Sequence, residues 1–273
     1  MIKNKKLKIL IVGKNSFLAK NYLNLSRFKK TIKLIKYTQI KKINYDSYSH
    51  LINFSYDQKI YEKRYNSKNC IDTKICNIIK NKDIIYIYPS SRLIYKSKSS
   101  KLSNLKKEKN FYSINKLITE NKVKRLRNKK YLILRIGNIL DFNLDNKNMF
   151  ISKLLNSLKN NDLIKFDLNK KNYKDFITIK FFTKVLDSLI ILNKSGTFNI
   201  SSGKKTNVYE IAKLIIKGYG KGNIFFEKKL YNDSFVLNNK KLKKITKLNL
   251  TKKEILDHCI YIGKKLKRVI NFN

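Results

Sequence analysis

Tryptophan is absent from this chain of 273 residues, proline occurs once, histidine twice and cysteine three times. Cys70, Cys76 and Cys259 form no CxxC pair, and His50 and His258 add no cluster of ligands. The sequence therefore predicts neither a metal site nor a disulfide framework. No apolar run reaches the ~18 residues of a membrane span, and the run after the basic N-terminus is too short for a secretory signal. We expect a cytoplasmic protein without a membrane span.

Acidic residues are also scarce: 18 Asp and Glu stand against 63 Lys and Arg, a formal net charge of +45. One interpretation is a partner with many phosphates, such as RNA. The other is compositional drift, which two observations favour. Only seven of the basic residues are arginine, the type that nucleic-acid sites use for bidentate and stacking contacts, and the lysines run along the whole chain. Nucleic acid is therefore the less favoured partner, although the composition does not exclude it.

The first half of the chain alternates short β-branched or apolar runs with stretches of helical spacing. This pattern predicts a parallel sheet with helices on both faces, an α/β Rossmann-like fold over residues 1–140. The stretch between the second and third strands is short, so we expect the sheet to lack one strand–helix step. The expected strands are 8–12, 31–37, 50–54, 84–88 and 131–135, and the expected helices are 17–25, 71–79 and 112–127.

The second half is less regular, and we interpret residues 141–273 as a small, mixed substrate-binding lobe with interleaved core elements. Asn207 is a candidate N-cap, and Thr251 with Glu254 has the spacing of a capping box. Residues 96–109 form a polar, low-complexity loop. The expected helices are 150–158, 181–192, 209–217 and 251–267, and the expected strands are 164–166, 176–179 and 197–200.

Gly13 ends the first predicted strand and stands before the first predicted helix. Glycine at such a turn lets the backbone approach a pyrophosphate, and the helix N-terminus supplies N–H groups and a favourable dipole. A full fingerprint has three glycines, whereas this segment has one, so the turn alone fits an ordinary strand–helix connection equally well. The candidate cofactor contacts here are Gly13, Asn15, Ser16, Phe17 and Leu18.

A second group of residues has the chemistry of a proton-transfer site. Ser91 follows the strand 84–88, and Tyr112 and Lys116 lie one helical turn apart on one face. A lysine ammonium beside a phenol stabilises the phenolate, and a serine hydroxyl can bind the same substrate oxygen. Such a set can protonate or deprotonate an alcohol while a hydride moves to or from a nicotinamide. The order of phosphate turn, serine-ended strand and YxxxK is more informative than any of them alone.

In this order the chain resembles the extended short-chain dehydrogenase/reductases of the NAD-dependent epimerase/dehydratase family, which act on nucleotide sugars in polysaccharide biosynthesis. The resemblance covers nearly the whole chain and implies a Rossmann-like fold and NAD or NADP as cofactor. Its segments are the turn 13–19, an Asn-x-Ala-like stretch at 52–55, Ser-Ser-x-x-Val-Tyr-like 90–95, YxxxK at 112–116, Leu-Arg-x-x-Asn at 134–138, an Arg-Asp-Phe-Ile-like stretch at 174–177, and 199–203.

The resemblance also implies residue roles. Ser91, Tyr112 and Lys116 are then catalytic, and Tyr112 and Lys116 also contact the cofactor. Further expected cofactor contacts are Lys36, Asn53 and Ser55, and the expected substrate contacts are Ser91, Arg92, Asn138 and Asp175.

Departures from the family narrow the reaction. Arg92 and Leu93 follow Ser91, where 4,6-dehydratases have an Asp-Glu pair and GDP-fucose synthase has a cysteine in place of Leu93. The resemblance thus implies 4-keto reduction or 4-epimerisation of a nucleotide-activated sugar, and leaves a homodimer open. Lys36 and Tyr37 stand where an acidic residue would bind the ribose of NAD, a slight preference for NADP. The alternative function is an RNA-binding or otherwise non-catalytic protein of the same fold.

Overall fold

The computed structural model describes residues 6–55, 63, 65–95, 111–126, 130–145, 149–231 and 233–271, and the polar loop expected at 96–109 lies outside these ranges. The chain divides into two compact units. Unit 1 comprises residues 1–136 and 183–199, and unit 2 comprises residues 137–182 and 200–273. The segment 183–199 therefore returns from the second half of the sequence to unit 1.

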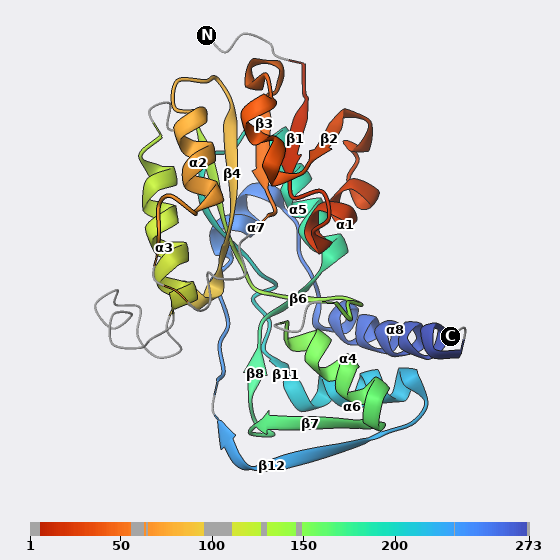
Figure 1. Ribbon diagram of the computed structural model, residues 1–273. Coiled ribbons are helices and arrows are strands. Elements are labelled where there is room, and N and C mark those ends of the chain that lie inside the picture. The colour runs from red at the N-terminus through yellow and green to blue at the C-terminus, as the bar shows by residue number, and fades with distance from the viewer. Residues whose placement is uncertain are drawn as a thin grey trace. The chain divides into compact units, whose positions relative to one another are not determined.

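Unit 1 is built on a six-stranded sheet (Figure 1). The neighbouring pairs β2–β1, β1–β3, β3–β4 and β4–β5 are all parallel, as the alternating pattern predicts. Between β2 and β3 the chain forms only short 3-10 turns, so β2 is the edge strand and the expected loss of a strand–helix step is confirmed. The strands in spatial order are β10 (Gly196–Ile200), β5 (Tyr131–Ile136), β4 (Ile85–Ser91), β3 (His50–Asn53), β1 (Ile9–Val12) and β2 (Ile32–Ile35).

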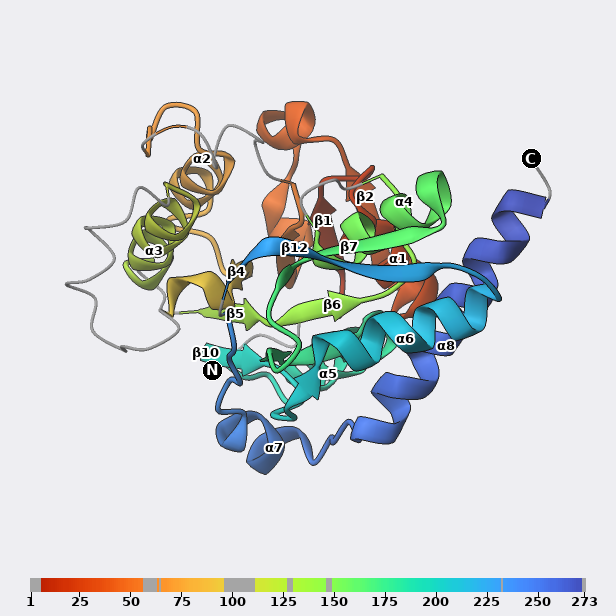
Figure 2. The same cartoon turned by 90° about the horizontal axis from the view of Figure 1, so that it is seen from below.

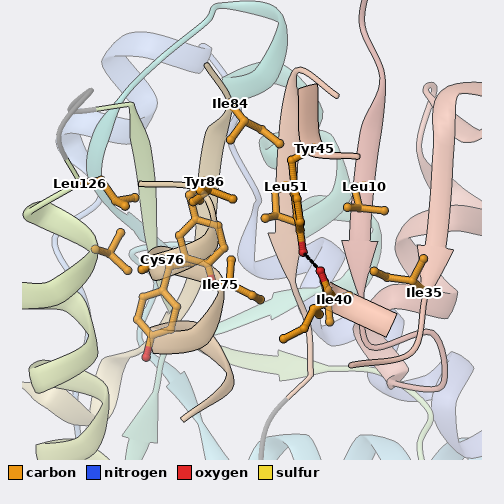
Figure 3. Close-up of a cluster of buried hydrophobic side chains, with 14 of the residues drawn as sticks. Leu10, Ile35, Ile40, Tyr45, Leu51, Ile75, Cys76, Ile84, Tyr86 and Leu126 are labelled. Atoms are coloured by element: carbon orange, nitrogen blue, oxygen red, sulfur yellow. Dashed lines mark hydrogen bonds between the residues drawn. The ribbon is translucent and has the colours of Figure 1, made fainter. Parts of the chain in front are cut away.

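One face of this sheet packs against α2 (Ile71–Ile78) and α3 (Phe111–Lys124). Figure 3 shows Leu10, Leu51 and Tyr86 from neighbouring strands within this buried cluster. The 3-10 turns after β2 close its rim, where the Tyr45 hydroxyl donates a hydrogen bond to the carbonyl of Ile40 over 2.6 Å. This core fixes α2 and α3 against the sheet, and both helices begin near the carboxyl ends of the strands.

The opposite face carries the alternate strand residues, such as Ile9 and Ile11, which are fully buried. Here α1 (Phe17–Leu25) is joined to α5 (Ile179–Ile191) by a buried carboxylate. Asp187 accepts hydrogen bonds from the Tyr22 hydroxyl at 2.7 Å and the Ser26 hydroxyl at 2.8 Å. Helices thus cover both faces of the sheet, which confirms the predicted α/β class.

Pro89 is a local correction to the sequence prediction, because β4 does not end before it but continues to Ser91. Backbone groups alternate sides along a strand, and the N–H of Ile85 points to the β3 side. The nitrogen of Pro89 faces that same side, where the pairing with β3 has already ended at Ile87. The missing N–H of proline therefore removes no hydrogen bond from the sheet.

The described residues of unit 2 form three two-stranded sheets and four helices, of which β6, β8, β11, β12 and α7 were not predicted from the sequence. The pairs β6–β9 and β7–β12 are parallel and β8–β11 is antiparallel. Figure 2 shows β7 and β12 side by side. The strands are β6 (Asn138–Leu140), β7 (Leu163–Leu168), β8 (Tyr173–Lys174), β9 (Phe176–Thr178), β11 (Thr206–Asn207) and β12 (Asn223–Tyr231), and the helices are α4 (Phe150–Asn161), α6 (Val208–Tyr219), α7 (Lys240–Thr246) and α8 (Lys252–Asn271).

The two predicted helix starts in unit 2 are confirmed. Asn207 accepts hydrogen bonds from the first backbone N–H groups of α6, and Thr251 and Glu254 form the reciprocal capping box of α8. The two helices then cross in close contact, because Gly218 and Gly263 face the partner backbone at the crossing and a Cβ at either position would collide with it.

Candidate functional site

The candidate cofactor and catalytic residues of unit 1 gather at one edge of its sheet. Gly13 follows β1, Asn53 ends β3 and Ser91 ends β4. These strands run in the same direction, so their carboxyl ends lie along a common edge, the usual ligand position in open α/β sheets. Figure 1 shows the first turn of α3 beside the end of β4, which adds Tyr112 to this edge.

Gly13 has a backbone that other residues rarely adopt. Its φ is +99°, and a Cβ on it would lie 2.5 Å from the backbone nitrogen of Ser55. The N–H groups of Gly13 and Lys14 donate to the carbonyl of Ile35 at 2.9 and 3.0 Å. The turn is therefore held between the ends of β3 and β2, and glycine is the residue that fits there.

The N-terminus of α1 follows this turn directly. Ser16 caps the helix by accepting a hydrogen bond from the Ala19 N–H at 3.1 Å, and the first turn contains no acidic side chain. Phe17 and Leu18 are half-buried in this first turn, whereas Asn15 is exposed. The N–H groups of a first helical turn have no hydrogen-bond partner within the helix. This end of α1 therefore suits the phosphates of a dinucleotide.

At the end of β2, Lys36 is exposed and the neighbouring Tyr37 is 56% exposed. Lys36 follows Ile35, whose carbonyl holds the Gly13 turn, so both belong to the same edge of unit 1. A cation rather than a carboxylate therefore stands next to the Gly13 turn.

Lys116 has a buried ammonium group at the end of β4. Its side chain is 8% exposed, and its Nζ donates a hydrogen bond to the carbonyl of Pro89 over 2.8 Å. The same Nζ lies 4.9 Å from the ring centroid of Tyr88 and 5.8 Å from that of Tyr112. Pro89 stands two residues before Ser91. The ammonium is therefore fixed near Tyr112 and the end of the strand that carries Ser91, its two predicted partners.

Ser91 ends β4 and caps the 3-10 turn Arg92–Ile94, where its Oγ accepts a hydrogen bond from the Leu93 N–H at 3.1 Å. The hydroxyl keeps a hydrogen that it can donate. Arg92 is half-buried in this same turn. Its position one residue after Ser91 keeps it a candidate substrate contact.

Asn53 and Ser55 are bound to each other and to α2. The Ser55 N–H and hydroxyl donate to Asn53 Oδ1 at 3.0 and 2.5 Å, while Asn53 Nδ2 donates to Asp72 Oδ1 at 2.6 Å. The Tyr86 hydroxyl donates to the same Asp72 oxygen at 2.6 Å. Burial raises the pKa of the Asp72 carboxyl, although the nearby Lys116 ammonium opposes the rise.

A second carboxylate, Glu120, lies fully buried one helical turn after Lys116. It accepts hydrogen bonds from the Ser90 hydroxyl at 2.6 Å and from Arg135 Nε and Nη2 at 3.1 and 2.7 Å. Arg135 also contacts the Tyr95 hydroxyl, which donates to Asn199 Oδ1 at 3.0 Å. This network joins β4, β5, β10 and α3 next to Ser91.

Sequence reasoning missed Asp72 and Glu120. Glu120 carried a signal, because it stands four residues after Lys116 on the same face of α3. Asp72 carried only a weak one, an acidic residue in the first turn of a predicted helix.

Asn138 and Asp175, the last two predicted substrate contacts, lie in unit 2 and are near each other. The Asn138 N–H donates to the carbonyl of Asp175 at 3.2 Å. The Asp175 side chain is fully buried and accepts hydrogen bonds from the N–H groups of Ser202 at 2.9 Å, Gly203 at 3.0 Å and Leu237 at 3.2 Å. Burial raises the pKa of the Asp175 carboxyl, while these donors oppose the rise. The carboxylate thus organises the loops around it.

Within the described parts of the chain, no three His, Cys, Asp or Glu side chains are grouped as metal ligands. In the same residues, no helix is both long and apolar enough to cross a membrane.

Comparison with solved structures relates this geometry to known proteins. A UDP-N-acetylglucosamine 4-epimerase from Methanobrevibacter ruminantium M1, in complex with UDP-N-acetylmuramic acid, superposes with a TM-score of 0.76 at 16% identity, covering 98% of this chain and 99% of that one. A dTDP-glucose 4,6-dehydratase from Bacillus anthracis with NAD gives 0.74 at 13% identity, covering 95% and 97%. The chain has the fold of the nucleotide-sugar epimerases and dehydratases.

A further structure of this fold, a UDP-N-acetylglucosamine 4-epimerase from Bacillus cereus, is 19% identical with a TM-score of 0.69, covering 96% of this chain and 100% of that one. No protein-family profile matches the sequence. No curated protein matches it either. The chain therefore resembles these epimerases and dehydratases in the course of its backbone far more than in its sequence.

Proposed function

We propose that this protein is an NAD(P)-dependent enzyme that reduces a 4-keto group or epimerises C4 of a nucleotide-activated sugar. The observation that carries the proposal is the buried ammonium of Lys116, which is anchored on the Pro89 carbonyl at 2.8 Å, two residues before Ser91 and one helical turn after Tyr112. A surface YxxxK would leave its lysine solvated, whereas the Lys116 ammonium is buried near the carboxyl end of β4.

The residues present fit a dinucleotide. Gly13 is crowded against Ser55 and keeps the turn narrow, and the first turn of α1 offers N–H groups without a carboxylate to repel phosphates. Lys116 would hold the nicotinamide ribose, and Asn53 and Ser55 would border the turn. When bound, NAD or NADP donates or accepts the hydride.

The chain's own residues would move the proton. Tyr112 would transfer it to or from the 4-oxygen of the sugar, with Lys116 stabilising the phenolate and Ser91 donating a hydrogen bond to the same oxygen. Removing or supplying this proton in step with the hydride avoids a high-energy alkoxide. In unit 2, Asn138 would contact the nucleotide sugar, and Asp175 would shape the loops that border it.

The test is to incubate the protein with a panel of UDP-, dTDP- and GDP-linked sugars, giving NADH or NADPH with the 4-keto sugars and NAD⁺ or NADP⁺ with the 4-hydroxy sugars. Oxidation of the nicotinamide with a 4-keto sugar identifies a reductase, and C4 inversion without net oxidation identifies an epimerase. If the protein neither binds a nicotinamide cofactor nor converts any sugar, but retains RNA in a gel-shift assay, the proposal fails and the RNA-binding alternative replaces it.

A further inference from the structure

We propose that Asp72 is a positioning residue of the unit 1 site: it connects the cofactor turn to Lys116 and provides the counter-charge of that lysine. This inference rests on the proposed function for its catalytic meaning. The electrostatic pair that it describes can be tested without turnover.

The first part of the argument is the hydrogen-bond chain from Asp72 to the cofactor turn. Asp72 Oδ1 accepts from Asn53 Nδ2 at 2.6 Å, and Asn53 Oδ1 accepts from the Ser55 N–H at 3.0 Å. Ser55 is the residue against which Gly13 packs so closely that a Cβ would lie 2.5 Å from its nitrogen. The position of the turn therefore depends on where Asp72 holds Asn53.

The second part is the placement of the two charges on one surface of β4. Asp72 accepts a hydrogen bond from the hydroxyl of Tyr86 at 2.6 Å, and the Lys116 ammonium lies 4.9 Å from the ring centroid of Tyr88. These tyrosines are two residues apart, so their side chains share one face of the strand. The helices that carry the charges also pack together, since Cys70 at the start of α2 contacts Thr119 of α3.

Charge balance supplies the physical reason. A buried ammonium is costly without an opposite charge, and removing one member of a buried pair destabilises a protein more than removing both. The Lys116 ammonium acts electrostatically on the Asp72 carboxyl. Asp72 would thus supply the negative charge opposite the Lys116 ammonium, while both side chains use their hydrogen bonds to fix β3 and β4.

The experiment is a double-mutant cycle with Asp72→Asn, Lys116→Met and the double variant, measured by thermal unfolding at about pH 8. Asn is isosteric and keeps an oxygen for Asn53 and Tyr86, so it removes mainly the charge. We expect each single variant to lower the Tm by roughly 6 °C or more. The double variant should recover at least half of the loss in Lys116→Met, because no unpaired charge is left.

The matched control is Asp187→Asn, which removes another buried carboxylate of unit 1, the one that joins α1 to α5. Its effect on Tm should add to that of Lys116→Met without recovery. Equal additivity for Asp72→Asn would overturn the proposed pair.

Cofactor titration by nicotinamide fluorescence gives the readout that a merely structural role would not move. Asp72→Asn should raise the Kd for NADH or NADPH about tenfold, the loss expected when a charge-assisted hydrogen bond is weakened. A Kd equal to that of the wild type would contradict the positioning role. If the wild type binds no cofactor, the proposed function fails while the thermal cycle still decides the Asp72–Lys116 pair.

Discussion

The Lys116 ammonium donates a hydrogen bond to the backbone carbonyl of Pro89 over 2.8 Å. The chain thereby uses its single proline to orient the lysine. Because the Pro89 carbonyl lies beyond the pairing of β4 with β3, it is available to the side chain. This contact ties the position of Lys116 to the strand that ends in Ser91.

Tyr112→Phe should lower turnover by roughly a hundredfold to ten-thousandfold and leave cofactor binding nearly unchanged, because only the proton donor is lost. Lys116→Met should lower both turnover and cofactor affinity. Raising the pH should partly restore turnover in Lys116→Met, since more phenolate then forms without the ammonium, but should not restore it in Tyr112→Phe. The measurement is a pH–rate profile on the best sugar of the panel. Full activity of Tyr112→Phe would remove this residue from the mechanism.

Gly13→Ala should weaken cofactor binding at least about tenfold, because the new methyl group meets the Ser55 backbone and the turn must open. Gly220→Ala is the matched control. Gly220 has nearly the same φ, +98°, but a Cβ there would meet only the end of the Lys267 side chain at 3.5 Å. Both variants carry the backbone strain, and only Gly13→Ala carries the crowding. Equal cofactor Kd values for the two variants would show that the close approach to Ser55 is unimportant.

Lys36→Asp should shift the cofactor preference towards NAD, since a carboxylate at the end of β2 can bind the ribose hydroxyls and repels a 2′-phosphate. We expect the ratio of Kd for NADPH to Kd for NADH to rise by about tenfold or more. Lys41→Asp is the matched control. It makes the same change of charge at an exposed position of the following 3-10 turn, away from the Gly13 turn. If both variants change the ratio equally, the effect comes from net charge and not from a contact with the ribose.

His50 predicts a pH dependence of stability. Burial lowers the pKa of this histidine to about 4 from 6.5. The unfolded chain therefore binds the proton first, and stability present above pH 6.5 is lost as the pH falls towards 4, by about 3 kcal/mol in total. His50→Gln should flatten this part of the profile, measured by urea unfolding at several pH values. A slope in His50→Gln equal to that of the wild type would contradict the assignment to His50.

The features that the sequence predicts best are local. The cap of α6 by Asn207 and the capping box of α8 depend on residues two or three positions apart, and both are present. The Gly13 turn is local in the same sense, because a strand, a glycine and a helix start follow one another directly.

The features that escaped prediction depend on contacts between distant segments. Asp72 gains its partners only when α2 lies over β3 and β4, and Glu120 meets Arg135 only when β5 lies beside α3. The sequence predicts a strand over 84–88 that stops before Pro89, but the effect of the missing proline N–H depends on which side of β4 the nitrogen faces. Sequence spacing cannot supply such information without the pairing of the strands.

The return of residues 183–199 to unit 1 has a consequence for how the protein is made. During synthesis, the first 136 residues leave the ribosome before the rest of their own unit exists. Until β10 arrives, β5 is an unpaired sheet edge, and until α5 arrives, the face that carries Ile9 and Ile11 lacks part of its cover. Exposed edges and apolar faces promote aggregation. A fragment that stops near residue 140 should therefore be insoluble when expressed alone, and the nascent chain needs the second half of its own sequence before its first unit can close.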